Sequence, residues 1–194
     1  GSSAAARQVV EEADELLQEF SLTTFSDLAW HQPAGLGREV LSTQTGMLIA
    51  DLVMLAALKE VGLQADFLAG HSFGEFAALV AAGSVSLRDA LIATQARSLA
   101  LSSVDSPNHG MLAIHGSEEA LRPLVESTPG LFISHCNSPR ETVVAGLRTG
   151  IEQLEKTLRS RSVASTVLAV PCAYHTPFIA PAQAPFARAL REIA

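Results

Sequence analysis

A serine between two glycines is the feature that most constrains what this chain can fold into. Residues 70–74 read Gly-His-Ser-Phe-Gly, with a short apolar segment, 67–70, before the serine and an Ala/Leu-rich helical segment, 74–82, after it. A strand, a tight turn and a helix in this order expose the central hydroxyl and direct the positive end of the helix toward it. The pattern predicts that Ser72 is a nucleophile and that the Phe73 N–H stabilises an oxyanion. The alternative is a Gly-Ser turn without chemistry.

Helices are predicted on both sides of this turn. Apolar residues recur at helical spacing over residues 7–20, and residues 43–59 are apolar on most sides, which indicates a buried helix. A further helix over 86–101 opens with Ser86-Leu87-Arg88-Asp89, which resembles a capping box. The segment 67–70 is expected to be a buried strand.

The second half of the chain has a different pattern. Strands are predicted over 111–115, 131–136, 142–145 and 165–170, and helices over 117–127 and 149–161. The second of these helices opens with a predicted capping box, Thr149–Glu152. The order β-α-β-β-α-β is that of a ferredoxin-like unit.

A nucleophilic serine needs a base, and the chain has six histidines. His175 follows the last predicted strand, so its ring could reach into a cleft; a surface histidine at a strand end is the alternative. Arg97 lies in the middle of a mostly apolar helix. Its guanidinium would either bind a carboxylate through two hydrogen bonds or reach the surface on its apolar stem.

Composition excludes several classes of protein. Hydrophobic residues make up 48% of the chain and charged residues 17%, so a disordered chain is excluded. The net charge is −7 and no basic run occurs, which argues against a nucleic-acid partner. No signal peptide is recognised at the start, and no apolar stretch reaches the roughly 20 residues of a membrane span. Two cysteines, Cys136 and Cys172, fit a reducing cytoplasm better than a disulfide scaffold.

Neither a metal nor a nucleotide cofactor is expected. Cys172 and His175 have Cys-x-x-His spacing, and His135-Cys136 could add two zinc ligands. Adjacent residues of a strand point to opposite faces, however, so these four would not easily share one ion. No glycine-rich dinucleotide motif or phosphate-binding loop is present in the sequence.

Several of these segments resemble malonyl-CoA:acyl carrier protein transacylases, the family that includes the acyltransferase domains of polyketide and fatty acid synthases. Residues 70–75 resemble the nucleophile motif of the family, and residues 174–177 match the segment that holds its catalytic histidine. Arg97 matches the arginine that family members use for the malonyl carboxylate. Thr43-Gln44 matches the pair that opens the buried helix, and residues 137–146 resemble strands of the family's insert.

The resemblance implies an α/β fold, in which a hydrolase-like α/β domain, incomplete at both ends, carries a ferredoxin-like βαββαβ subdomain. Residues 1–108 would form the partial hydrolase-like part, 109–171 the ferredoxin-like subdomain, and 172–194 the return to the larger part. The family's Gly-Gln-Gly-Ser-Gln type loop, whose glutamine supplies a second oxyanion donor, has no match in this sequence.

The resemblance also implies transfer of a malonyl unit from coenzyme A to the phosphopantetheine thiol of an acyl carrier protein, through an acyl-serine. The implied catalytic residues are Ser72 and His175, with Phe73 in the oxyanion hole and Arg97, Gln44, Tyr174 and Cys172 binding substrate. Malonyl-CoA is then a substrate, and no bound cofactor or metal is required. The expected partners are the acyl carrier protein and neighbouring synthase domains in the cytoplasm, with no nucleic acid and no membrane.

The residues before the histidine bear on the acyl unit. An aromatic residue at this place, Tyr174, resembles the malonyl-selecting pattern, because its bulk excludes an α-methyl branch. Phe73 stands where methylmalonyl-type domains often carry Gln, whereas Cys172 departs from both common patterns. The segment 176–186 resembles iterative synthases of the enediyne and polyunsaturated fatty acid types.

Two other functions remain open. A serine thioesterase or esterase would share the turn and would need an acidic third member between Ser72 and His175. The candidates are Asp89, Asp105, Glu118, Glu119, Glu126, Glu141, Glu152 and Glu155. A catalytically incomplete docking fragment would instead bind an acidic carrier protein through a basic patch. Its candidates are Arg122, Arg140, Arg159 and Arg161.

Overall fold

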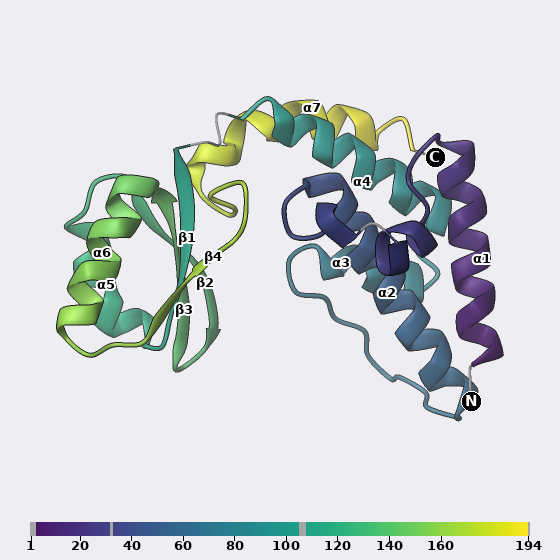
Figure 1. The fold of residues 1–194 in the computed structure, drawn as a ribbon, viewed down its shortest axis with the longest axis horizontal. Helices are drawn as coiled ribbons and strands as arrows, with labels where there is room; N and C mark the ends of the chain where they lie inside the picture. The colour runs from purple at the N-terminus through teal and green to yellow at the C-terminus, as the bar shows by residue number, and fades with distance from the viewer. Residues whose placement is uncertain (1–2, 32, 105–107, 194) are drawn as a thin grey trace. The chain divides into compact units, whose positions relative to one another are not determined.

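The computed structural model describes residues 3–31, 33–104 and 108–193 of the chain. The chain divides into two compact units, one made of residues 1–98 and 188–194 and the other of residues 99–187 (Figure 1). Each unit has a hydrophobic core of its own. The three-part division at residues 108 and 171 that the sequence suggests stays a prediction.

The first unit is built from helices. These are α1 (Ala4–Glu19), α2 (Val40–Glu60), α3 (Gly74–Ala81) and most of α4 (Leu87–Ser102), with two short turns, η1 (Asp27–His31) and η2 (Pro33–Gly35), between α1 and α2. α1 packs against α2, and α2 packs against α3. The four helices predicted for this part of the sequence are therefore confirmed. Fully buried Leu17, Leu48, Ile49 and Leu91 lie in the core that they form.

The predicted strand before the serine is wrong. Residues 67–70 form neither strand nor helix, and the Phe67 side chain is 93% exposed. A strand forms only when a neighbouring segment completes its hydrogen-bond ladder. Among the described residues every strand belongs to one sheet of the second unit, so the segment 67–70 has no strand beside it.

The length of α2 also corrects an expectation. By length and composition alone, α2 is apolar enough to cross a membrane, although the sequence was expected to hold no such stretch. A core helix of a soluble protein has the same composition, and α2 packs against α1 and α3. Its outer side leaves Met47 and Met54 exposed.

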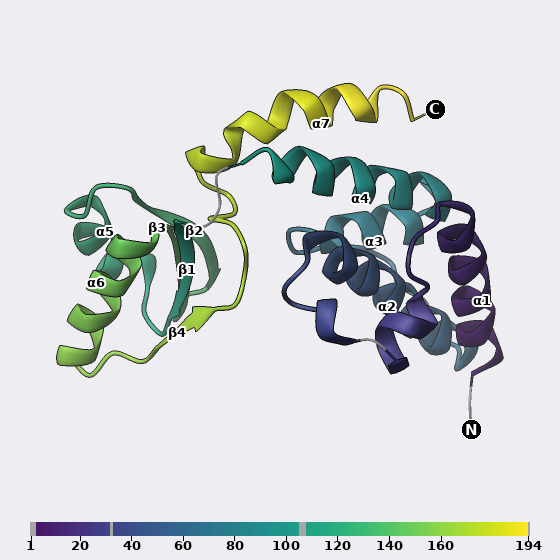
Figure 2. The same ribbon diagram turned by 45° about the horizontal axis from the view of Figure 1, so that its top comes forward.

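The second unit contains a sheet and two helices in the predicted order. They are β1 (His109–Ile114), α5 (Glu118–Glu126), β2 (Leu131–Ser138), β3 (Glu141–Leu147), α6 (Arg148–Ser160) and β4 (Ser165–Leu168). The strands lie in the order β2-β3-β1-β4, and every neighbouring pair is antiparallel. The predicted ferredoxin-like βαββαβ unit is confirmed. Figure 2 shows α5 and α6 together on one face of the sheet.

Alternation along the strands separates two apolar layers. Leu112 and Val144 lie in the core that α5 and α6 cover. Their neighbours Met111 and Ala145 point to the other face, where they form a separate cluster with Ala173. That face therefore carries the segment after β4, which continues into η3 (Pro177–Ala182) and α7 (Gln183–Leu190).

The two predicted capping boxes differ in outcome. The Ser86 side chain accepts a hydrogen bond from the Asp89 N–H at 3.0 Å and donates to the Asp89 carboxylate, so this cap is present. The box at Thr149 is wrong, because α6 begins one residue earlier, at Arg148, and has no side-chain cap. The Arg148 N–H donates instead to the Asn108 carbonyl at 2.7 Å, which ties the start of α6 to the chain just before β1.

Candidate active site

The backbone at Ser72 has the conformation of a sharp turn into a helix. Its φ is +52°, in the left-handed region that a serine adopts at a cost. The Gly74 N–H donates to the His71 carbonyl at 3.0 Å, and the Glu75 N–H donates to the Ser72 carbonyl at 3.2 Å, so the turn leads directly into α3. The strained turn that the Gly-x-Ser-x-Gly motif predicts is therefore present, even though no strand precedes it.

Only one of the two glycines in this motif is required by close packing. A Cβ on Gly70 would lie 2.2 Å from the Glu75 nitrogen and 2.3 Å from the Gly74 carbonyl carbon, distances that no real Cβ tolerates. A Cβ on Gly74 would meet nothing within 4 Å. Gly70 therefore lets the incoming chain pass against the first turn of α3.

Phe73 links the serine turn to α4. It is the N-cap of α3, its side chain is buried, and its ring stacks on Phe76 with centroids 5.1 Å apart. The guanidinium carbon of Arg97 lies 5.7 Å from the centroid of the Phe73 ring. Arg97 is half-buried, and one guanidinium nitrogen, Nη1, is buried. The structure places it beside the residue that follows Ser72.

Gln44 lies in the first unit, on α2. The side chain is 6% exposed, and its Oε1 has no hydrogen-bond donor among the described residues. Buried polar atoms without a partner are uncommon and call for an explanation, such as a missing ligand group. The family resemblance implies that Gln44 binds substrate, whereas no spacing in the sequence points to it.

The other predicted residues lie in the second unit. Cys172 is buried, and Tyr174 packs against the apolar cluster of Met111 and Ala145 on the open face of the sheet. His175 is exposed and has a φ of +56°. The Thr176 hydroxyl donates to the Ala173 carbonyl at 2.7 Å and closes the turn around His175.

A residue that the sequence analysis considered only as a possible zinc ligand contacts His175. The ring of His135, on β2, meets the His175 ring edge to face, with centroids 4.5 Å apart and an interplanar angle of 76°. The Ser134 hydroxyl lies 2.7 Å from His135 Nδ1 and donates to the Tyr174 carbonyl at 3.0 Å. The only hint in the sequence was that two polar residues, Ser134 and His135, lie in the middle of a predicted strand. The fold brings them into contact with Tyr174 and His175.

The four candidate zinc ligands do not come together in one site. The Cys136 thiol points to Glu118 on α5, whose carboxylate it contacts at 3.0 Å, while the ring of its neighbour His135 packs against His175. Across residues 3–31, 33–104 and 108–193, no three His, Cys, Asp or Glu side chains gather in a way that could hold a metal ion.

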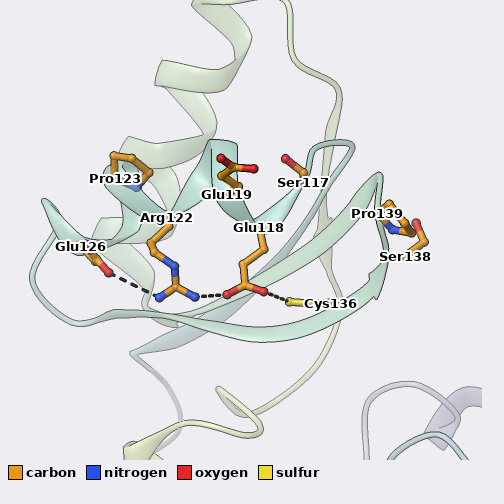
Figure 3. Close-up of a pocket in the computed structure, with 9 residues that line it drawn as sticks. All are labelled: Ser117, Glu118, Glu119, Arg122, Pro123, Glu126, Cys136, Ser138 and Pro139. Carbon is orange, nitrogen blue, oxygen red and sulfur yellow. Dashed lines mark hydrogen bonds and ion pairs between the residues drawn. The ribbon is translucent and has the colours of Figure 1, made fainter.

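Most acidic candidates for a hydrolase triad are engaged elsewhere. Asp89 caps α4, and the side chain of Glu141 accepts from Asn137. Figure 3 shows Arg122 between Glu118 and Glu126, with an ion pair to each, in a surface pocket of about 680 Å³ on α5 and β2. Asp105 lies outside the described residues.

The same ion pairs bear on the docking alternative. Arg122 is neutralised by two glutamates, and Arg159 forms an ion pair with Glu155 at 2.9 Å, one turn away on α6. Two of the four arginines that could make a basic patch therefore already pair with acids. This weakens the case for a carrier-binding patch on α5 and α6.

Comparison with known proteins places these features in a family. The family described as "Acyl transferase domain" matches residues 1–194. The chain is 29% identical over 177 residues to the non-reducing polyketide synthase nscA of Arthroderma gypseum, covering 88% of this chain and 10% of that protein. It is 29% identical over 195 residues to the malonyl CoA-acyl carrier protein transacylase of Bacillus subtilis, covering 97% of this chain and 59% of that protein.

Solved structures agree with this assignment. The crystal structure of FabD from Acinetobacter baumannii has a TM-score of 0.86 at 29% identity, covering 98% of this chain and 62% of that one. The acyltransferase domain of an iterative polyketide synthase in enediyne biosynthesis has a TM-score of 0.72 at 31% identity, covering 84% of this chain and 43% of that one. The chain thus spans about a tenth of the polyketide synthase and about three fifths of the Bacillus subtilis transacylase and of the Acinetobacter baumannii FabD chain.

Proposed function

The chain belongs to the acyl transferase domain family, and from that premise we propose that it moves a malonyl unit from coenzyme A to the phosphopantetheine thiol of an acyl carrier protein. The acyl unit would be held between the two transfers as an ester of Ser72. Acyl-CoA and carrier protein are the two substrates that a transacylase of this kind requires.

One observation carries this proposal. The Arg97 guanidinium lies over the ring of Phe73, and Phe73 directly follows the serine of the strained turn. A nucleophile with a fixed, partly buried guanidinium close by fits an acyl group that ends in a carboxylate. A simple esterase has no need of such a cation.

The first transfer would begin with attack of the Ser72 hydroxyl oxygen on the thioester carbonyl carbon, while His175 takes the hydroxyl proton. The negative oxygen of the tetrahedral intermediate would accept a hydrogen bond from the Phe73 N–H at the start of α3, where helix N–H groups have no partner within the helix. Collapse of the intermediate breaks the carbon–sulfur bond. The proton on His175 then goes to the departing thiolate of coenzyme A.

The second transfer would reverse these steps with a different thiol. The phosphopantetheine thiol gives its proton to His175 and attacks the ester carbon of acyl-Ser72. The carbon–oxygen bond to the serine then breaks, and the proton returns to the Ser72 oxygen. The cycle leaves the protein unchanged, and no cofactor enters the balance.

Four further residues would select and hold the substrate. Arg97 would bind the free carboxylate of malonate, which favours malonyl over acetyl units. Gln44 would donate a hydrogen bond from its side-chain amide N–H to the acyl carbonyl or to the carboxylate. Tyr174, together with the buried Cys172, would exclude an α-methyl branch.

The experiment that tests this proposal is mass spectrometry of the intact protein after a brief incubation with malonyl-CoA. We expect a single malonyl adduct on the wild-type chain and none on Ser72→Ala. Ser21→Ala is a matched control, because Ser21 also has a positive φ, of 58°, and is exposed. An adduct that persists in Ser72→Ala, or a folded chain that takes no acyl unit from malonyl-, acetyl- or methylmalonyl-CoA, would overturn the proposal.

A further inference from the structure

We propose that Ser134 and His135 of β2 are positioning residues that hold the imidazole of His175 in place for acyl transfer. The inference rests on the proposed function, because it gives His175 a task that depends on where its ring points. It concerns residues of the second unit alone.

The backbone at His175 needs support from outside its own turn. Its φ of +56° lies in the left-handed region, which costs a residue with a side chain of order 1 kcal/mol or more. The Ser134 hydroxyl donates to the Tyr174 carbonyl at 3.0 Å and so fixes the peptide group that leads into His175. Ser134 lies at a register shift of β2, between Ile133 and His135, which pair with successive residues of β3 and hold the chain on both sides of it.

The same hydroxyl determines which nitrogen of His135 carries a proton. A serine has one hydrogen to donate, and a carbonyl oxygen can only accept, so the hydrogen of Ser134 goes to Tyr174. His135 Nδ1, 2.7 Å away, must then donate to the Ser134 oxygen. Neutral His135 is therefore the Nδ1–H tautomer, and its ring plane is fixed by the hydroxyl.

The fixed ring of His135 in turn restricts the orientations that the His175 ring can adopt. The two rings meet edge to face at 4.5 Å, a geometry that aromatic pairs favour. A chain of contacts thus runs from the β2 backbone through Ser134 and His135 to the ring that is proposed to move the proton. Preorganisation of this kind acts on the rate of the chemical steps, not on the binding of the acyl-CoA.

The test uses Ser134→Ala, which removes the hydroxyl, Ser134→Thr, which restores it, and His135→Phe, which keeps an aromatic ring but loses Nδ1–H. Ser138→Ala is the matched control, because Ser138 is also on β2 and its hydroxyl also has a hydrogen bond with the backbone, in which it accepts from the Arg140 N–H at 3.1 Å. Nitrogen-15 NMR of labelled histidine reads the tautomer of His135 and the environment of His175 without any turnover. Malonyl transfer from malonyl-CoA to free pantetheine, followed at several malonyl-CoA concentrations, gives kcat and KM.

We expect wild-type His135 to show the Nδ1–H pattern, and Ser134→Ala to lose it and to shift the His175 ring signals. Its kcat should fall by about ten- to a hundredfold, as small misplacements of reacting groups produce, with KM within about twofold. Ser134→Thr should recover most of the rate, and Ser138→Ala should match wild type. Unchanged His175 signals in both Ser134→Ala and His135→Phe, or unchanged kcat in both, would overturn the inference.

A failure of the proposed function looks different. If His175→Ala loads malonate at the wild-type rate, His175 is not the base, and the positioning role for this reaction fails with it. If the NMR signals respond as expected in a chain that does not load, the contacts of Ser134 and His135 are confirmed without help from activity.

Discussion

The guanidinium carbon of Arg97 lies 5.7 Å from the centroid of the Phe73 ring, and Phe73 is the residue next to Ser72. A cation over an aromatic face gains roughly 0.5–1 kcal/mol when exposed and more when desolvated. The contact therefore fixes a charged group of α4 against the turn that presents the serine.

Replacing Arg97 with Ala should lower malonyl loading by about tenfold or more, because a charge-assisted hydrogen bond to the carboxylate is worth about 1.5–3 kcal/mol. Acetyl loading, which uses no carboxylate, should fall much less. Competition between malonyl-CoA and acetyl-CoA measures the ratio. Arg88→Ala is a matched control, because Arg88 is also on α4 and also lies over a phenylalanine ring, that of Phe20. An equal loss of malonyl and acetyl loading would contradict the carboxylate role.

Replacing Gly70 with Ala should destabilise the first unit, because the added Cβ would meet backbone atoms of α3 at 2.2–2.4 Å. We expect a loss of about 2 kcal/mol or more in the free energy of unfolding, at the upper end of the cost of overpacking. Denaturant unfolding measures it. Gly74→Ala, which adds a Cβ in open space, should be neutral. Equal stability of the two variants would show that the close approach at Gly70 is not a constraint.

Replacing Gln44 with Met should leave stability unchanged or raise it by about 1 kcal/mol, because a buried carbonyl oxygen without a donor is removed. If Gln44 binds the acyl group, KM for malonyl-CoA should rise at the same time, by about five- to tenfold for one lost hydrogen bond. Gln95→Met is the control, since Gln95 Nε2 is also buried without an acceptor among the described residues. A wild-type KM in Gln44→Met would remove this residue from the site.

Replacing Tyr174 with Ala should relax the choice of acyl unit. Removal of a side chain that excludes one methyl group changes selectivity by about tenfold or more, so methylmalonyl loading should rise relative to malonyl loading. Phe178→Ala, which alters the same apolar cluster on the sheet, serves as the control. A wild-type chain that already prefers methylmalonyl-CoA would reverse the assignment.

The N-terminus of α1 should lose order in acid. The Ser3 hydroxyl, and then the Ala5 N–H, hold the pKa of the exposed Glu60 carboxyl below its ordinary value of 4.5. A lowered pKa in the folded state means that the stabilisation is present above pH 4.5 and is lost as pH falls through the lower, folded value. Hydrogen exchange at the Ala5 amide should accelerate over that range relative to the rest of α1. Glu60→Gln should abolish the pH dependence, whereas Glu11→Gln should leave it intact.

Local pattern was enough to predict most of the fold. The helical spacing of apolar residues predicted α1, α2 and α4, because one face of each of these helices is buried in its own unit. The alternation in the second half predicted the ferredoxin-like unit, because its four strands pair with one another and complete their own sheet. The turn at Ser72 followed from the glycines around it, since the left-handed backbone there is a local property.

The remaining features depend on contacts that a sequence does not display. Residues 67–70 have the composition of a buried strand, but a strand requires a neighbour, and the described residues provide none at this place. Thr149 has the spacing of a cap, yet the hydrogen bond between Arg148 and Asn108 sets where α6 begins. The ring of His135 contacts that of His175 only because the segment after β4 packs on the face of the sheet toward which the His135 side chain points.

The exposed segment that leads to the serine turn also determines how the chain behaves in solution. The Val61 and Phe67 side chains are 80% and 93% exposed, and no strand among the described residues lies along this stretch. An extended apolar segment without a partner is a template to which the same segment of a second molecule can add, side by side. Association of that kind grows with protein concentration and would bury the approach to Ser72. Kinetic and spectroscopic measurements on this chain should therefore be compared at several protein concentrations.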